Sequence, residues 1–162
     1  MRREMPSFVL SHATSLDDVR EVRALFEEYA ASLGFSLCFQ GFDRELAELP
    51  GAYAPPTGRL LLARVDGEAA GCVGLRPIGE HVCEMKRLFV RPAHHGTGLG
   101  RRLATAVIDE ARRAGYATMK LDTLPSMKAA MGLYESLGFR DTAPYTLNPI
   151  EGARFMALTI TP

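Results

Sequence analysis

Hydrophobic and polar positions alternate along the chain with two periods, one typical of helices and one typical of strands. From Ser15 to Gly34 the spacing is helical, with apolar residues at Val19, Val22, Phe26, Tyr29 and Leu33. Serine suits a helix N-cap, the aspartates that follow suit its first turn, and glycine suits the position past its end. The pattern predicts an amphipathic helix over residues 15–34.

Strand-like runs make up much of the remaining chain. The predicted strands are SFVL, RLLLARV, EAAGCVGLR, HVCEMKRLFV, ATMKLDTL and GARFMALTI. Asp66 and Gly67 separate the second run from the third and suit the positive φ angles of a tight turn, so these two strands should form a hairpin. Further helices are predicted in DRELAELPG, where Pro50 ends the pattern, and in SMKAAMGLYESLG.

A helical segment over residues 98–114 joins two of these strands, HVCEMKRLFV and ATMKLDTL. A strand that follows such a helix normally lies parallel to the strand that precedes it. The fold class is therefore α/β with a mixed sheet, covered by helices on both faces. A chain of 162 residues is expected to form one domain, residues 1–162.

Composition narrows the classes of function. Lys plus Arg and Asp plus Glu each number 19, so no bulk charge favours a nucleic acid or an anionic membrane. The three cysteines, Cys38, Cys72 and Cys83, form no metal-binding or disulfide pattern and are expected to be reduced thiols. With no signal peptide and no apolar run of membrane-spanning length in the sequence, a soluble cytoplasmic protein is expected.

The segment HHGTGLGRR places three glycines within five positions just before the 98–114 helix. Such a turn brings backbone N–H groups together at the positive end of a helix dipole, where phosphates bind. The P-loop pattern fails because no GK pair follows, and the dinucleotide pattern GxGxxG fails at Arg101 or Leu103. A plain strand-to-helix connector is the alternative to a phosphate site.

This segment resembles motif A of the GNAT superfamily of acetyl-CoA-dependent N-acetyltransferases. The resemblance lies in CEMKRLFVRPAHHGTGLGRRL and in AMGLYESLGF, which is similar to motif B, and it covers about Val82 to Arg140. It implies the GNAT fold, a mixed and mostly antiparallel six- to seven-stranded sheet splayed between its central strands. His95 stands where the superfamily has Gln or Arg, which predicts weaker or pH-sensitive coenzyme binding.

The resemblance also implies where acetyl-CoA, the co-substrate, would bind. The pantetheine arm would lie along the strand that contains Leu88, Phe89 and Val90, and the Leu88 N–H would be the donor to the acetyl oxygen. The pyrophosphate would bind the loop residues His95, Gly96, Thr97, Gly98, Leu99, Gly100 and Arg101. No metal is implied, and a homodimer is compatible with the resemblance.

Two residues are candidates for proton transfer. Glu84 lies four residues before Leu88, on the same side of an alternating strand, and resembles the base of histone-type members. The alternative is a salt-bridged glutamate. Tyr134 resembles the tyrosine that many members place near the coenzyme sulfur as general acid, and the alternative is core packing. Arg101 and Arg102 either bind an anion or are simply solvated.

The acceptor side is predicted from aromatic residues beside a cation. Phe39 and Tyr53 with Arg76, next to Glu84, would suit a small primary amine that also carries a carboxylate. The predicted function is direct acetyl transfer within a ternary complex, with Glu84, Leu88 and Tyr134 as its catalytic groups. A peptide or protein amine as acceptor and a non-catalytic coenzyme A sensor are the alternatives.

Overall fold

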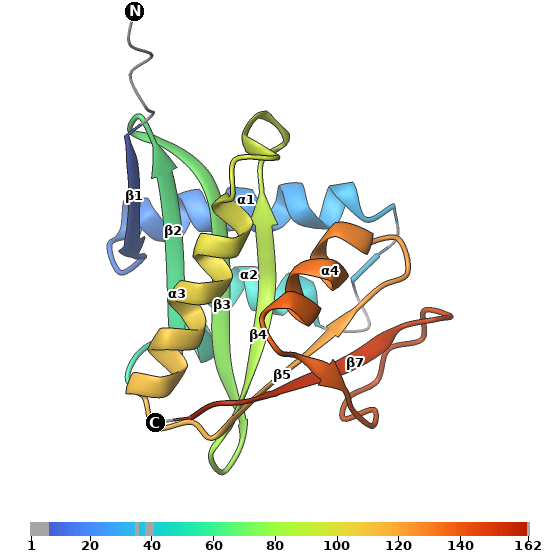
Figure 1. The fold of residues 1–162 in the computed structure, drawn as a ribbon. Helices are drawn as coiled ribbons and strands as arrows, with labels where there is room; N and C mark the ends of the chain where they lie inside the picture. Colours follow the sequence, from blue (N-terminus) through green and yellow to red (C-terminus); the bar gives the residue numbers. More distant parts are fainter. Residues whose placement is uncertain (1–6, 35, 38–40, 162) are drawn as a thin grey trace, which may run out of the picture.

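The computed structural model describes residues 7–34, 36–37 and 41–161, and its core is one seven-stranded sheet (Figure 1). The strands lie in the order β1-β2-β3-β4-β5-β7-β6. They are β1 (Phe8–His12), β2 (Arg59–Val65), β3 (Glu68–Gly79), β4 (Val82–Val90), β5 (Thr118–Thr123), β6 (Arg140–Asp141) and β7 (Arg154–Thr159). The helices are α1 (Leu16–Ser32), α2 (Phe42–Glu48), α3 (Leu99–Arg113) and α4 (Lys128–Ser136).

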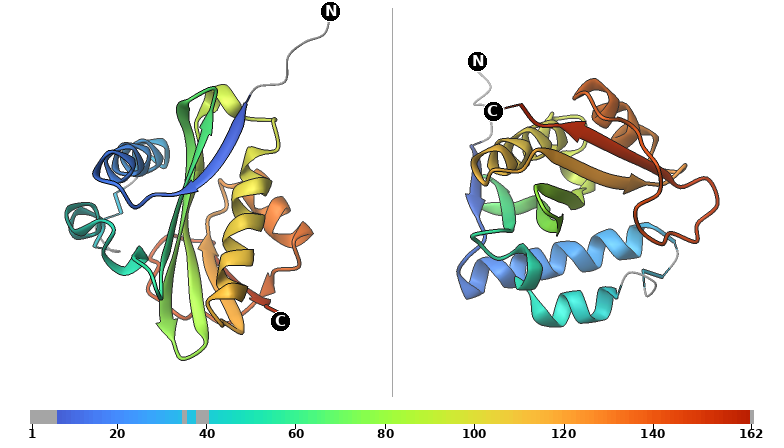
Figure 2. Two further views of the ribbon diagram at one scale, coloured as in Figure 1. Left: turned by 90° about the vertical axis from the view of Figure 1, so that its left-hand side faces the viewer. Right: turned by 90° about the horizontal axis from the view of Figure 1, so that it is seen from below.

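Helices cover both faces of the sheet, as predicted. Helices α1 and α2 lie on one face and α3 and α4 on the other (Figure 2). Two hydrophobic clusters result. The first packs α1 and α2 on the sheet through residues such as Val22, Phe26, Phe42, Leu62 and Cys72. The second packs α3 and α4 through residues such as Leu103, Val107, Tyr134, Met85 and Met119.

Local signals in the sequence are confirmed. The Ser15 side chain accepts a hydrogen bond from the Asp18 N–H at the start of α1, and Gly34 after α1 has a φ of +74°. Asp66 and Gly67 both have positive φ in the turn of the β2–β3 hairpin. Strand β6, only two residues long, was not predicted because so short a run carries no period.

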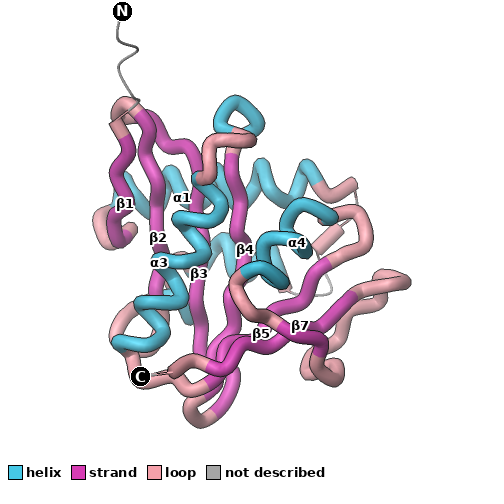
Figure 3. Tube along the Cα trace, viewed as in Figure 1, coloured by secondary structure: helices cyan, strands magenta, loops and turns pink. Residues whose placement is uncertain are grey.

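Strands β4 and β5 are parallel, also as predicted, but they pair over only three residues. The pairs run from Val82 with Thr118 to Glu84 with Lys120. Beyond this point the two strands diverge, and α4 lies beside the opening between them (Figures 1 and 3). The predicted splay between central strands is therefore present at β4 and β5. Residues 85–90 of β4 border the opening.

A β-bulge in β4 reverses one prediction. The pairing of β3 with β4 changes register between Cys72 and Gly74, opposite Arg87, whose φ is +59°. Such a bulge inserts one residue and switches the side-chain alternation that follows it. Glu84 therefore faces α1 and α2, whereas Leu88 packs against the cluster under α3 and α4. The prediction that they share one side of the strand is wrong.

A buried carboxylate ties the first strands to α3. Glu110 of α3 accepts hydrogen bonds from Arg59 of β2 and Arg113, and lies 3.1 Å from His12 of β1. Burial alone would raise the pKa of Glu110, but the Arg59 hydrogen bond and the charges of His12 and Arg113 outweigh it and lower the pKa. The ionised form is therefore the one that stabilises the fold.

Glu110→Gln is expected to lower the free energy of unfolding by about 1–2 kcal/mol at pH 7. Because the folded-state pKa lies below the unfolded one, this stabilisation is present above the ordinary carboxyl pKa. It is lost as the pH falls through the folded-state pKa. Urea unfolding of both proteins from pH 7 to pH 3 checks this, and a difference that does not shrink toward pH 3 would contradict it.

Candidate active site

The glycine-rich loop before α3 has the conformation that a phosphate site needs. Gly96 and Gly98 have φ angles of +78° and +83°, which side chains other than glycine rarely adopt. Gly98 is the N-cap of α3, and no side chain within the described residues caps this end. The first N–H groups of α3 and the positive end of its dipole are thus left for an anion.

Side chains around this loop hold it against the rest of the protein. The His95 ring Nε2 lies 2.8 Å from the Val90 carbonyl oxygen, so the imidazole links the loop to the end of β4. The Thr97 hydroxyl donates to the His94 carbonyl oxygen, and the Arg101 guanidinium donates to the Ser136 hydroxyl of α4. His95 therefore stabilises the shape of the loop.

Two grooves run from this loop toward the splay. One has a volume of about 340 Å³ and lies between the loop and α4; it is lined by Leu88, Val90, His94, His95, Gly96, Gly98, Leu99, Gly100, Ala129, Ala130 and Leu133. The other, of about 770 Å³, extends to α1 and includes Leu88, Phe89, Val90 and His95. Seven of the predicted coenzyme residues thus line the first groove, and Phe89 lines the second.

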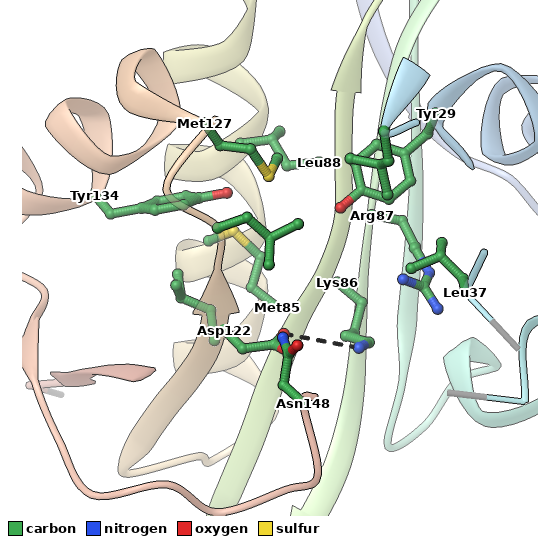
Figure 4. A pocket seen from close by; sticks show the side chains of 13 residues that line it. Tyr29, Leu37, Met85, Lys86, Arg87, Leu88, Asp122, Met127, Tyr134 and Asn148 are labelled. Atoms are coloured by element: carbon green, nitrogen blue, oxygen red, sulfur yellow. Dashed lines mark hydrogen bonds and ion pairs between the residues drawn. The ribbon is translucent and has the colours of Figure 1, made fainter. Parts of the chain in front are cut away.

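A small pocket of about 30 Å³ lies at the splay itself (Figure 4). Tyr134 of α4 and Leu88 of β4 approach it from opposite sides, and the Tyr134 hydroxyl points to its centre. Tyr134 is 6% exposed, and burial raises the pKa of its phenol. The hydroxyl therefore keeps its proton and can donate it at this position.

The floor of this pocket is formed by charged side chains that were not singled out from the sequence. Lys86 and Asp122 are both buried, with Lys86 Nζ 3.9 Å from Asp122 Oδ1 (Figure 4). The Asn148 side-chain amide donates to Asp122 Oδ2 at 3.0 Å. Charged residues in the middle of the buried runs CEMKRLFV and MKLDTL were the available signal.

Glu84 is buried, at 1% exposure, and both of its carboxylate oxygens have partners. Arg76 Nε donates to Oε1 at 2.8 Å and the Tyr145 hydroxyl donates to Oε2 at 2.5 Å. Glu84 does not line the pocket that contains Tyr134 and Leu88. Its predicted role as base stays a prediction, and the contacts show that it orients Arg76.

Arg76 and Tyr53 do come together, as the acceptor-side prediction requires. Both line a pocket of about 220 Å³ between α2 and β3, which also contains Glu45 and Glu48. The Tyr53 ring packs on Gly74, and its buried hydroxyl has no hydrogen-bond partner among the described residues. Phe39, the third predicted acceptor residue, lies outside the described residues.

The described part of the chain gives little support for a cysteine nucleophile, a metal site or a membrane span. Cys72 and Cys83 are buried free thiols, and burial raises the pKa of Cys83 to about 12, so neither is an activated nucleophile. No group of three or more His, Cys, Asp or Glu side chains in these ranges could hold a metal ion. No described helix is long and apolar enough to cross a membrane.

Comparison with known proteins decides the family. Residues 22–139 match the model of the acetyltransferase (GNAT) family. The chain belongs to the GNAT family of N-acetyltransferases. It is 41% identical over 159 residues to an uncharacterized N-acetyltransferase of Schizosaccharomyces pombe, covering 96% of this chain and 98% of that one.

Two further comparisons concern a named relative and a solved structure. An IAA acetyltransferase of Azospirillum brasilense is 33% identical over 143 residues, which cover 87% of this chain and 90% of that one. A solved structure from Salmonella typhimurium, which contains its cofactor acetyl-CoA, has a TM-score of 0.69 and 24% identity, covering 95% and 94% of the two chains. The latter shows the fold alone.

The GNAT family uses acetyl-CoA, and the residues present fit it. The uncapped N-terminus of α3 and the left-handed Gly96 and Gly98 suit its pyrophosphate. The two grooves lead from there along β4 to the splay. The predicted family, enzyme class and fold are thereby confirmed, whereas the role of each site residue remains a proposal.

His95→Arg is expected to tighten acetyl-CoA binding several-fold at pH 8, because a permanent cation next to the pyrophosphate site would replace the imidazole. Calorimetric titration at low and high salt checks this. The gain should shrink at high salt, as expected of a partly exposed charge. Unchanged or weaker affinity at low salt would show that the contact between His95 and Val90 matters more than charge.

Proposed function

We propose that residues 1–162 form one N-acetyltransferase domain that transfers the acetyl group of acetyl-CoA directly to the primary amine of a small molecule. The observation that carries this proposal is the Tyr134 hydroxyl, which points into the splay opposite Leu88 (Figure 4). When bound there, acetyl-CoA supplies a thioester to the pocket. Tyr134 then protonates the departing sulfur, and the Leu88 N–H donates to the acetyl oxygen.

The size and charge of the acceptor side favour a small amine that carries a carboxylate. The pocket at the splay, of about 30 Å³, admits an amino group and little more. Arg76 is held by Glu84 through Nε and also lines the larger pocket beside Tyr53. A guanidinium is a donor that suits a carboxylate.

The proton of the acceptor's ammonium must also be removed. Glu84 is the base that the sequence predicts, and it accepts hydrogen bonds from Arg76 and Tyr145. The similarity to the IAA acetyltransferase of Azospirillum brasilense supports a small-molecule acceptor for this chain. A peptide or protein amine is the rival acceptor, since a chain N-terminus has the same amino group without a carboxylate beside it.

Calorimetry with acetyl-CoA, followed by a thiol-release assay over matched amines, tests the proposal. Each amino acid is paired with its amide, so that only the carboxylate differs. We expect binding, thiol release from small amines and a lower KM for the carboxylate member. Turnover of peptides alone would favour the rival acceptor, and binding without turnover of any amine would favour a coenzyme A sensor.

A further inference from the structure

Lys86 is a buried lysine on the wall of the pocket where acetyl transfer is proposed. Its residue is 5% exposed, and its side chain lines the same pocket as Leu88 and Tyr134 (Figure 4). A buried ammonium loses its hydration, so a lysine in this place is costly unless neighbouring groups compensate or the amine gives up its proton. A side chain of this kind beside the reacting atoms points to a chemical role.

The charged groups around Lys86 come from β3, β4 and β5. Asp122 of β5 forms an ion pair with its Nζ at 3.9 Å, and the Asn148 amide donates to the other oxygen of that carboxylate. Loss of solvent lowers the pKa of Lys86. Against this, Glu84 and Asp122 raise it, while Arg87 and Arg76 lower it further. The neutral phenols of Tyr29 and Tyr134 line the same pocket.

We propose that Lys86 is the general base of the reaction, accepting the proton of the acceptor's ammonium on an uncharged Nζ. This inference rests on the proposed function. Glu84 is less well placed, because it lies outside the pocket and both of its oxygens accept hydrogen bonds. Lys86 lines the pocket itself.

The protons balance as follows. The acceptor ammonium gives one proton to Lys86 Nζ, and the freed nitrogen forms the C–N bond to the acetyl carbon while the C–S bond breaks. Tyr134 gives its proton to the departing sulfur and regains one from the acceptor nitrogen. The products are an amide and a thiol, and Lys86 releases its proton to solvent after the product has left. No oxidant or metal is consumed.

Asp122 is a positioning residue in this scheme. It lies on β5, across the splay from Lys86, and its orientation is fixed by the Asn148 amide from the loop before β7. Its carboxylate stabilises the ammonium that forms on Lys86. Lys86 and Asp122 thus act together, the amine as the proton acceptor and the carboxylate as the group that stabilises its charged form.

Lys86→Arg tests the base directly, because arginine keeps the positive charge beside Asp122 but cannot lose its proton. Thiol release is measured from pH 6 to pH 10 for this variant, for wild type and for Glu84→Gln, with acetyl-CoA affinity and thermal midpoint as controls. We expect Lys86→Arg to lower kcat/KM by about 10²-fold or more and to remove the acidic limb of the pH profile. Acetyl-CoA affinity should stay unchanged.

A Lys86→Arg variant within threefold of wild type, or loss of the acidic limb in Glu84→Gln instead, would overturn the inference. Should Lys86→Arg not fold, Lys86→Met removes both charge and base, and is expected to lose activity equally. Wild-type protein in the same assay reports on the proposed function separately. If wild type shows no turnover of any amine, both proposals fail; if it turns over and the Lys86 variants do too, only the base assignment fails.

Discussion

Tyr134→Phe is expected to lower kcat by about 10²-fold or more while leaving acetyl-CoA affinity and stability almost unchanged. The reason is that the hydroxyl alone is removed. The ring remains, and its centre stays 5.7 Å from that of Phe139 in an edge-to-face contact. Helix α4 therefore keeps its packing. General acid catalysis typically contributes 10²- to 10⁴-fold to a rate.

The rate effect should depend on the leaving group, which separates an acid from a packing residue. A sulfur that leaves as a stable thiolate needs no proton, so a thioester with a more acidic thiol should partly rescue the variant. Steady-state kinetics with acetyl-CoA and with an activated thioester analogue measure this. Equal losses with both donors would mean that Tyr134 only shapes the pocket.

Tyr116→Phe is the matched control. The Tyr116 hydroxyl donates a hydrogen bond to the Thr57 carbonyl oxygen at 2.6 Å. Tyr116 lines neither of the two grooves nor the pocket at the splay. Its loss removes one hydroxyl from the protein without touching the proposed site. A comparable fall in kcat in this variant would contradict the acid role of Tyr134.

Features carried by neighbouring residues could be predicted from the sequence. The N-cap at Ser15, the turn at Asp66 and Gly67, and the left-handed glycines before α3 each depend on a few adjacent positions. The parallel pairing of β4 and β5 follows from one strand-helix-strand unit and the handedness of its connection. The fold class was therefore accessible from local patterns and one topological rule.

The arrangement within the site was less accessible, because it depends on contacts between distant segments. The bulge at Arg87 requires a positive φ in a residue other than glycine, and alternation alone misplaced Leu88 relative to Glu84. Tyr145 reaches Glu84 from 61 positions away. A single sequence contains no signal for such pairs, whereas the composition of a run such as CEMKRLFV does show that charges are being buried.

The bulge itself is held by a contact whose loss should be costly. The Arg87 side chain is 2% exposed, and its guanidinium donates two hydrogen bonds to Glu45 of α2, at 2.9 Å and 3.1 Å. Burial would lower the pKa of Arg87, but the hydrogen bonds and charge of Glu45 outweigh it and raise the pKa. The guanidinium also lies 5.1 Å from the centre of the Phe42 ring. Helix α2 is thus attached to β4 through this ion pair and the contact of Arg87 with Phe42.

Glu45→Gln is expected to lower the free energy of unfolding by about 3 kcal/mol, because a buried guanidinium would lose its counter-charge and one strong hydrogen bond. For a chain of this length that corresponds to roughly 6–12 °C in thermal midpoint. Thermal and urea unfolding, with and without acetyl-CoA, measure the change. We also expect slower turnover, since Arg87 borders Lys86 and Leu88 on the strand that forms the site.

Glu48→Gln on the same helix is the matched control. Glu48 pairs with Arg44 one turn away at 2.9 Å, but the two side chains are 57% and 82% exposed. Water and salt screen such a pair, so its loss should leave the thermal midpoint unchanged within error. Equal stability of both variants would mean that Arg87 does not need Glu45, and the positive φ at Arg87 would then have to be held by the β3 and β4 backbones alone.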